Sequence, residues 1–352
     1  MAQSSAALRA RKKDEEQPAV TDAPGPYSVA QSAAFDPSAF VPADLADLDN
    51  QQTDLPRLAK DAESMARIEA AIKTVPTAHD IYLHDARRLD FIADNSVHLV
   101  LTSPPYWTLK KYRDGDDQMG DIDDYDEFLD ELDRVWAHCR RVLVPGGRLI
   151  CVVGDVCLSR RKNKGRHTVV PLHASIQERC RVLDFDNLAP IIWHKIANAV
   201  YEAEGNGGGF LGKPYEPNAV IKNDIEFILM QRRPGGYRSP RPHARTLSLI
   251  SEENHRQWFQ QVWTGLTGAS TRAHPAPYPL ELAQRLIRMF SFVGDVVLDP
   301  FAGTGTTTTA AALWGRNSIA VEVDPHYLEL ARERIHRDTG DLFSRASFHF
   351  HD

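Results

Sequence analysis

The sequence has few cysteines, no long apolar run and no excess of positive charge. Its 352 residues contain only four cysteines, and no two of them have the C-x-x-C spacing of a metal site or a redox pair. We therefore expect reduced core cysteines in a cytosolic protein. No apolar run approaches the roughly 18 residues of a membrane span, and the N-terminus lacks the apolar core of a signal peptide. What remains is a soluble chain that is long enough for one large α/β domain with appendages.

A formal net charge of −7 is not typical of a nucleic-acid-binding protein, but the charge is unevenly distributed. Residues 121–133 are strongly acidic, whereas two other runs are basic and contain no acid. The first basic run consists of Arg160, Arg161, Lys162, Lys164 and Arg166, and the second of Arg232, Arg233, Arg238, Arg241 and Arg245. Either run could be a solvated loop. Because both follow strands of one predicted sheet, they favour phosphate contacts, and the candidates are Arg160, Arg161, Lys162, Lys164, Arg238 and Arg241.

The order of predicted elements indicates one α/β domain behind a less ordered segment. Residues 1–60 are rich in Ala, Ser, Pro and Asp, so we expect a disordered or loosely attached leader, followed by an entry helix over residues 61–73. Short apolar strands then alternate with amphipathic helices over residues 75–200 and 274–337, which is typical of a doubly wound, mostly parallel sheet. The more irregular residues 201–273 are either a target-reading insert or a surface excursion.

The chain is organised around the apolar run of residues 98–101 and the six residues after it. The run predicts a buried strand, and it is followed by Thr102, Ser103, Pro104, Pro105, Tyr106 and Trp107. The two prolines end the strand, because proline donates no ladder hydrogen bond and fixes φ. Ser103 and the Pro104 carbonyl are therefore expected at the carboxyl edge of the sheet, where open α/β sheets bind ligands.

This edge has the chemistry to hold a planar amino group. The diprolyl backbone at Pro104 and Pro105 offers carbonyl oxygens without competing N–H groups, and the Ser103 hydroxyl is a further acceptor. An amino group on a heterocycle could donate both hydrogens to Ser103 and the Pro104 carbonyl while its ring stacks on Tyr106. The nitrogen lone pair would then point away, toward an electrophile. The alternative is a strand end and a proline turn in which the aromatic residues only pack.

A second set of residues begins at Asp299, which ends a strand and precedes a glycine loop and a helix N-terminus at Thr306. Gly303 and Gly305 allow a tight turn and close approach of a ligand. The acid at Asp299 suits the cationic, amino-bearing methionine end of S-adenosylmethionine better than a pyrophosphate. Glu322 ends the next strand, where a carboxylate can accept both ribose hydroxyls, and Asp324 is the competing candidate for that role.

Together, these motifs resemble those of amino-group DNA methyltransferases over roughly residues 75–337. Residues 102–107 are similar to the family's catalytic motif in the form most often seen in cytosine-N4 enzymes, and residues 299–305 are similar to its cofactor motif. The resemblance implies catalytic roles for Ser103, Pro104, Pro105 and Tyr106. It implies that S-adenosylmethionine is held by Asp85 (near the adenine amino group), Pro275, Asp299, Phe301, Gly303, Gly305, Thr306 and Glu322.

The catalytic motif precedes the cofactor motif, which matches the circularly permuted, β-type arrangement of that family. The resemblance thus implies a Rossmann-like sheet of seven strands, of which the one at residues 225–231 is antiparallel. No large, well-marked recognition domain separates the two halves. No cysteine follows a proline, so the nucleophile of cytosine-C5 methyltransferases is absent.

The implied reaction is methyl transfer to the N4 amino group of a cytosine that has been flipped out of double-stranded DNA, without a metal or a covalent intermediate. Adenine-N6 methylation by the same geometry is the nearest alternative, although that family more often has Asp or Asn where Ser103 stands. A non-catalytic DNA-binding reader and an RNA or protein methyltransferase are further alternatives. A cognate restriction endonuclease is a candidate partner, and no membrane is expected. The location would be cytoplasmic (nucleoid) in a bacterium or phage and nuclear in a eukaryote.

Overall fold

A computed structural model describes residues 35–107, 118–161, 163–195, 223–268, 278–340 and 345–351. Nine strands form one sheet in the order β11-β1-β10-β9-β2-β3-β7-β6-β8. Every neighbouring pair is parallel except those with β7, which runs antiparallel to β3 and β6. The strands are β1 (Thr77–Leu83), β2 (Val97–Thr102), β3 (Leu143–Val153), β6 (Asp186–His194), β7 (Ile225–Arg232), β8 (Val262–Trp263), β9 (Val296–Asp299), β10 (Asn317–Glu322) and β11 (Ala346–His351).

The predicted fold class is confirmed, because the seven expected strands are all present in a mostly parallel sheet and β7 is the antiparallel one. Two strands that the sequence did not indicate extend the sheet to nine. β8 has only two residues and pairs with β6, and β11 pairs with β1 at the opposite edge. Alternate residues of β11 are exposed, as expected of an edge strand with one solvated face.

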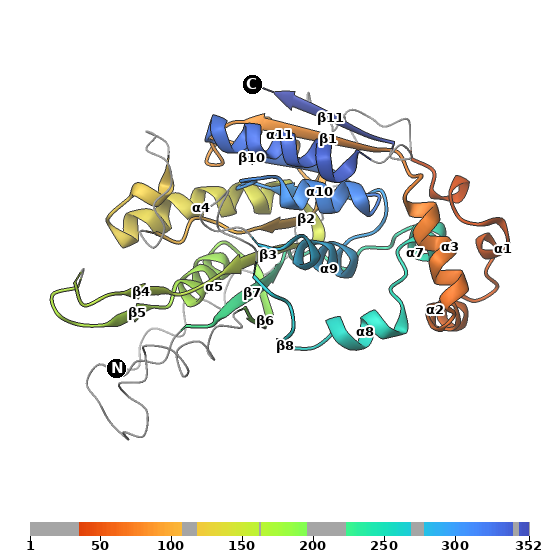
Figure 1. Ribbon diagram of the computed structural model, residues 1–352, viewed down its shortest axis with the longest axis horizontal. Helices are drawn as coiled ribbons and strands as arrows, with labels where there is room; N and C mark the ends of the chain where they lie inside the picture. Colours follow the sequence, from red (N-terminus) through yellow and green to blue (C-terminus); the bar gives the residue numbers. More distant parts are fainter. Residues whose placement is uncertain are drawn as a thin grey trace, which may run out of the picture.

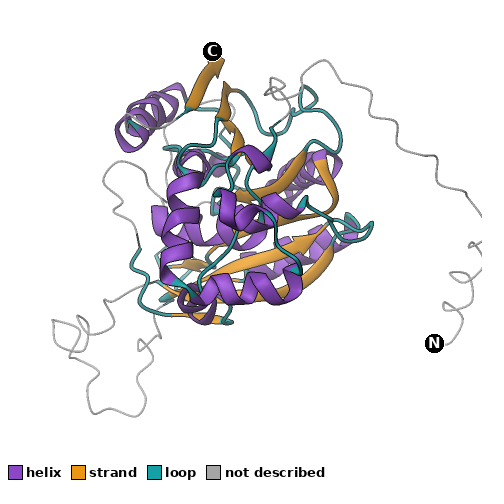
Figure 2. Ribbon diagram, turned by 90° about the vertical axis from the view of Figure 1, so that its right-hand side faces the viewer, coloured by secondary structure: helices purple, strands orange, loops and turns teal. Residues whose placement is uncertain are grey.

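Helices cover both faces of the sheet (Figures 1 and 2). Leu99 and Leu101 of β2 pack with α9 and α10, whereas Val100 packs with α4 and α5, so the central strand is buried on both sides. This double burial explains its uninterrupted apolar sequence. The helices are η1 (Pro37–Ala39), α1 (Ala43–Ala46), α2 (Gln51–Lys60), α3 (Ala62–Ile72), η3 (Met119–Asp121), α4 (Tyr125–Val142), α5 (Leu172–Val182), α7 (Pro242–Leu247), α8 (Glu252–Trp258), α9 (Leu280–Phe290), α10 (Thr306–Leu313) and α11 (Pro325–Thr339). None of these has the length and apolar character required to cross a bilayer.

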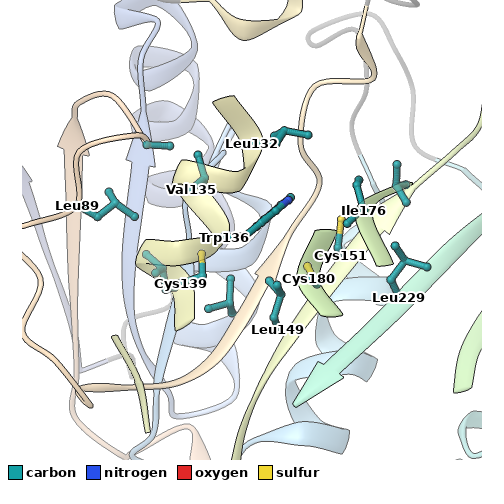
Figure 3. Close-up of a cluster of buried hydrophobic side chains, with 14 of the residues drawn as sticks. Leu89, Leu132, Val135, Trp136, Cys139, Leu149, Cys151, Ile176, Cys180 and Leu229 are labelled. Carbon is teal, nitrogen blue, oxygen red and sulfur yellow. The ribbon is translucent and has the colours of Figure 1, made fainter. Parts of the chain in front are cut away.

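The hydrophobic cluster that α4 and α5 form with the sheet contains three of the four cysteines. Figure 3 shows Trp136 of α4 with Cys139, Cys151 and Cys180 among aliphatic side chains. All four cysteines are free thiols, and Cys157 is the one that is only half-buried. Burial raises the pKa of Cys139 and of Cys151 far above that of an exposed thiol, so these groups stay protonated and act as small apolar residues.

The N-terminal segment differs from the expected loose leader where the structure describes it. Residues 43–60 form α1 and α2, which pack with α3 and α7 through a cluster that includes Leu58, Ile68 and Leu247. Leu247 lies about two hundred residues further along the chain, so local sequence patterns do not reveal this contact. Residues 1–34 lie outside the described part of the chain.

A β-hairpin and a group of helices lie at opposite ends of the molecule. β4 (Val156–Leu158) and β5 (Thr168–Val170) form an antiparallel hairpin that continues from β3 at its carboxyl end. Figure 1 shows this hairpin projecting on the left, whereas α1, α2, α3 and α7 gather on the right. α7 and α8 lie in the stretch expected to be irregular, and they pack onto the body through Leu247 and Trp258.

Candidate active site

One pocket lies at the carboxyl edge of the sheet, where β1, β2, β9 and β10 end side by side. Parallel strands bring these ends together, so residues from four distant parts of the sequence meet there. The pocket is lined by His84, Asp85, Ala86, Ser103, Pro105, Gln118, Met119, Pro300, Phe301, Gly303, Val321, Glu322, Val323 and Tyr327. The structure thus brings two residues of the predicted catalytic motif together with four of the predicted cofactor residues.

The Ser103 hydroxyl is held by a short chain of hydrogen bonds. Ser103 Oγ donates to the Tyr106 hydroxyl over 3.3 Å, and that hydroxyl donates to the Val152 carbonyl of β3 over 3.4 Å. A serine hydroxyl has one proton and two acceptor lone pairs. Because its proton is used inside the protein, both lone pairs of Ser103 remain available to an N–H donor in the pocket.

Tyr106 and Pro104 are placed differently from the expectation. The Tyr106 side chain is only 5% exposed and belongs to the core cluster beneath the pocket, so its ring is not an open stacking surface. Pro104 is buried, and Pro105 is the proline that lines the pocket. Gly154 lies against this ring, and a Cβ there would be at ordinary contact distance, 3.5 Å, from Tyr106. Tyr106 therefore supports Ser103 from below.

Glu322 lies at the end of β10 with its carboxylate against the glycine loop. Oε2 accepts a hydrogen bond from Gly303 N over 2.7 Å, and Oε1 accepts one from Asp324 N over 3.0 Å. Burial raises the pKa of Glu322 to about 7, although these two N–H groups act in the opposite direction. Asp324 itself caps α11 by accepting from His326 N over 2.8 Å, and it does not line the pocket. The geometry therefore favours Glu322 over Asp324 as the ribose ligand.

Asp85 follows β1 and lines the pocket beside His84. Its carboxylate accepts hydrogen bonds from Arg87 Nε at 2.9 Å and from Arg88 Nη2 at 3.3 Å. Burial alone would raise the pKa of Asp85, but the Arg87 hydrogen bonds and charge outweigh it and hold that pKa below its usual value. Arg87 also pairs with Glu131 of α4 over 2.8 Å. Asp85 is thus a fixed, ionised acceptor at the pocket wall.

Asp299 does not have the predicted position in the pocket. It is 2% exposed and is not among the residues that line the pocket. Four donors surround its two oxygens: Thr102 Oγ1 at 2.7 Å, Phe301 N at 3.1 Å, Thr307 Oγ1 at 2.6 Å and Tyr278 OH at 3.2 Å. A carboxylate has about four acceptor sites, so none remains for the amino group of a ligand. The expectation that Asp299 binds the methionine end is therefore not supported.

Two more predicted cofactor residues, Gly305 and Thr306, also lie outside the pocket lining. Gly305 has φ +74° as it enters α10, and a Cβ there would lie 2.9 Å from Ile335 of α11, so glycine is needed for the close packing of two helices. Thr306 is buried, and its hydroxyl accepts a hydrogen bond from Arg334 of α11 over 2.8 Å. Pro275 lies outside the described residues.

The two basic runs are at opposite ends of the sheet. Arg160, Arg161 and Lys164 are exposed in the connection of the β4–β5 hairpin, which leaves β3 at the pocket edge. Lys162 is outside the described residues. Arg238 instead forms a bidentate ion pair with buried Asp295, and Arg241 donates to the Phe35 carbonyl. Antiparallel β7 carries the chain to the amino edge of the sheet, so the second run lies away from the edge that holds the pocket, and the phosphate contacts of both runs stay predictions.

Several pocket residues lie outside the predicted motifs. His84 and Ala86 flank Asp85, and Val323 follows Glu322, so adjacency to predicted strand ends could have suggested these three. Tyr327 comes from the first turn of α11, where no sequence signal indicates a ligand contact. Met119 lies in η3, where no sequence motif indicates a ligand contact either.

Comparison with known proteins identifies one family. A family model described as DNA methylase matches residues 97–333. The chain is 36% identical over 287 residues to the Type II methyltransferase M.MthZI of Methanothermobacter thermautotrophicus, and the match covers 74% of this chain and 77% of that protein. It is 35% identical over 292 residues to the Type II methyltransferase M.MjaI of Methanocaldococcus jannaschii, covering 74% of this chain and 92% of that protein.

Solved structures agree with these sequence matches. TTHA0409 of Thermus thermophilus, provisionally named a DNA modification methylase and solved in complex with S-adenosyl-L-methionine, is 52% identical with a TM-score of 0.64, and the match covers 78% of this chain and 98% of that one. The cytosine-N4-specific PvuII DNA methyltransferase shares the fold at 16% identity and a TM-score of 0.53, over 78% of this chain and 96% of its own. The pocket has the carboxylates, the glycine loop and the apolar wall that an adenosyl ligand requires. The chain therefore belongs to the N6- and N4-amino DNA methylases, with S-adenosylmethionine as its methyl donor.

Proposed function

We propose that this protein methylates the N4 amino group of a cytosine that has been turned out of duplex DNA. The observation that carries this proposal is the hydrogen-bond direction at Ser103. Because Ser103 donates its proton inward to Tyr106, it can act on the pocket side only as an acceptor. An exocyclic amino group is a donor with two hydrogens, and it is the complementary partner for this hydroxyl. A serine in this position of the motif is the reason for proposing cytosine rather than adenine.

In this mechanism the protein orients the amino nitrogen. Ser103 Oγ and the Pro104 carbonyl accept the two amino hydrogens, which turns the nitrogen lone pair toward the methyl group, and Pro105 contacts the base. S-adenosylmethionine, when bound, supplies a methyl group that is already electrophilic. The nitrogen forms the new bond to the methyl carbon as the carbon–sulfur bond breaks, and the amino group then releases one proton to solvent. Alignment thus provides most of the rate enhancement.

The residues of the pocket divide between the base and the cofactor. We assign the adenosyl part of S-adenosylmethionine to the wall made by Asp85, Phe301, Gly303 and Glu322, which lies on β1, β9 and β10. The base enters on the side of β2 and β3, where Ser103 lies. Turning the base out of the helix costs a few kcal/mol, which contacts with the DNA backbone must offset.

The β4–β5 hairpin is the surface that we assign to the DNA backbone. β4 begins two residues after Gly154, which lies beside Tyr106, and the stretch from residue 159 to residue 170 contains basic residues and no acid. Asn163 N bonds to Ser159 O over 3.0 Å and Gly165 N to Arg160 O over 2.9 Å, so the connection has a defined shape. A basic loop beside the base pocket has the charge to contact phosphates next to the flipped nucleotide.

Removing the charge of this hairpin should weaken DNA binding without affecting the cofactor. In the triple variant R160Q/R161Q/K164Q, we expect DNA affinity at low salt to fall by about tenfold or more, and the slope of log affinity against log salt to fall by up to about three. The affinity for S-adenosylmethionine should not change. Fluorescence anisotropy over a salt series measures the slope. The matched control is R241Q at the amino edge, which should retain wild-type DNA binding, and equal losses in both variants would contradict the assignment.

The test of the proposed reaction is direct. The purified protein is incubated with labelled S-adenosylmethionine and mixed-sequence duplex DNA, and the DNA is then digested to nucleosides for mass spectrometry. N4-methylcytosine is the expected product. If the product is N6-methyladenine, the proposed orientation of an amino group still holds, but the assigned base is wrong. Label in RNA and not in DNA would overturn the substrate.

A further inference from the structure

Asp299 connects the two halves of the active site. It ends β9, is 2% exposed, and accepts hydrogen bonds from residues on both sides of the pocket. We propose that Asp299 is a positioning residue that sets the spacing between the glycine loop and the Ser103 motif, and thereby the alignment of the amino nitrogen with the methyl donor. This inference rests on the proposed function, because it concerns the step that Ser103 orients.

On the side of the target base, the connection passes through Thr102. Thr102 is fully buried, ends β2, and donates from Oγ1 to Asp299 Oδ1 over 2.7 Å. The next residue is Ser103, so a single peptide unit joins the fixed hydroxyl to the reactive part of the motif. The ladder with β3, in which Thr102 lies opposite Cys151, holds the strand end from its other side. The position of Ser103 thus depends directly on the contact between Thr102 and Asp299.

On the cofactor side, the same carboxylate holds the glycine loop and α10. Asp299 Oδ1, which already accepts from Thr102, also accepts from Phe301 N over 3.1 Å, and Phe301 lines the pocket. Oδ2 accepts from Thr307 Oγ1 of α10 over 2.6 Å. The Thr307 hydroxyl also lies 3.3 Å from the Leu101 carbonyl of β2. Asp299 Oδ1 therefore joins β2, which leads to Ser103, to the loop that faces the cofactor.

The partners of Asp299 make it suited to fixing a distance. All four are neutral hydroxyl or amide donors, so directional hydrogen bonds, and not an ion pair, fix the carboxylate in place. Burial raises the pKa of Asp299, although these donors work to lower it. Methyl transfer is sensitive to such positioning, because a misplacement of 1 Å can reduce a rate by about a hundredfold.

The experiment compares variants that alter this contact without emptying the site. T102V keeps the size of the side chain but removes its hydrogen bond to Asp299, and T102S restores the hydroxyl. We expect T102V to lower kcat by about tenfold to a hundredfold while the Kd for S-adenosylmethionine, measured by calorimetry, stays within about threefold of wild type. T102S should recover most of the rate. Amide hydrogen exchange of the segment that contains Phe301 should be faster in T102V, since that segment loses its fixed neighbour.

Two further variants provide controls. T309V removes a fully buried hydroxyl of α10 that donates to the carbonyl of Gly305, the N-cap residue of that helix, and has no contact with Asp299 among the described residues. It should leave kcat and the exchange of the segment that contains Phe301 unchanged. In D299N the amide oxygen can still accept from Thr102 Oγ1 and Phe301 N, whereas the amide NH2 requires the hydroxyls of Thr307 and Tyr278 to accept a hydrogen bond instead of donating one. Both hydroxyls can rotate to do so, and the variant should therefore fold and retain cofactor affinity. Wild-type kcat and exchange in T102V would overturn the inference. A loss of cofactor affinity in T102V and D299N equal to the loss of kcat would also overturn it, since Asp299 would then act through cofactor binding.

The outcome for Asp299 is separable from that for the proposed function. If the wild-type protein methylates adenine, the proposed base is wrong, but the comparison of T102V with T102S still decides the positioning role. If the wild-type protein methylates no DNA, hydrogen exchange still tests the positioning role without any turnover. The segment that contains Phe301 should then exchange faster in T102V than in T309V.

Discussion

Ser103→Ala should lower kcat by about a hundredfold or more while the Kd for S-adenosylmethionine stays near the wild-type value. The substitution removes the acceptor that orients the amino group, and losing one preorganised hydrogen-bonding group in an active site costs about that much. It should not unfold the protein, because Tyr106 OH still donates to the Val152 carbonyl and no buried donor is left unpaired. Single-turnover methyl transfer at saturating DNA and cofactor, with calorimetric cofactor binding, measures both quantities.

The control for this prediction lies at the other end of the same strand. Ser96 precedes β2 and donates from Oγ to Ala93 O over 2.6 Å, far from the pocket. S96A should therefore retain wild-type kcat. Y106F gives an intermediate case, because it keeps the buried ring but removes the group that takes the Ser103 proton. Full activity in S103A would show that another group holds the amino hydrogens, and equal losses of kcat and cofactor affinity would place Ser103 in the cofactor site.

The edge positions of the site were predictable because they depend on local sequence and one topological rule. An apolar run that stops at Ser103, or at Glu322, marks the carboxyl end of a strand, and parallel strands bring such ends to one edge. The same rule predicted that Asp299 lies at this edge, but it did not predict the direction of the Asp299 side chain. That direction depends on Thr102 and Thr307, which are remote in sequence and supply the hydrogen bonds that hold the carboxylate inward.

The expectations that failed depended on contacts between distant segments. Arg238 looked like a free cation in the sequence, but it neutralises Asp295, a buried acid more than fifty residues away. The packing of α1 and α2 depends on Leu247, which no local periodicity reveals. β7 runs antiparallel as expected, and this direction places the second basic run at the amino edge of the sheet. Local patterns thus indicated the elements and strand ends, whereas long-range pairing determined which charges remained available.

Glu322→Gln should weaken S-adenosylmethionine binding by about tenfold to a hundredfold and remove most of its pH dependence. An ionised carboxylate accepts hydrogen bonds about twice as strong as those to a neutral amide, and the ribose offers two hydroxyl donors. In the ligand-free protein, burial raises the pKa of Glu322 to about 7. Below that pH the carboxyl is protonated, so binding must first remove a proton. Wild-type affinity should therefore be about tenfold weaker at pH 6 than at pH 8.

The same pKa shift predicts the opposite trend for the stability of the ligand-free protein. Glu322 has an ordinary pKa of 4.5 when unfolded and about 7 when folded, so the folded state favours its protonated form. This contribution to the free energy of unfolding, roughly 3 kcal/mol, is fully present below pH 4.5 and is lost as the pH rises through about 7. Between pH 6 and pH 8 the cofactor should therefore bind more tightly while Glu322 stabilises the empty protein less.

Asp324→Asn is the matched control for the Glu322 experiment. Asp324 is equally buried and two residues away, and asparagine caps a helix as well as aspartate does, so α11 should remain intact. Calorimetric titration from pH 6 to pH 8 should give this variant the wild-type affinity at pH 8 and a retained pH dependence, shifted toward lower pH because the charge of Asp324 helps to raise the pKa of Glu322. If the affinity for S-adenosylmethionine depended on pH equally in wild type, E322Q and D324N, the titrating group would be the amino group of the cofactor itself. If D324N lost affinity and E322Q did not, the ribose would belong to Asp324, and the raised pKa of Glu322 would affect only folding.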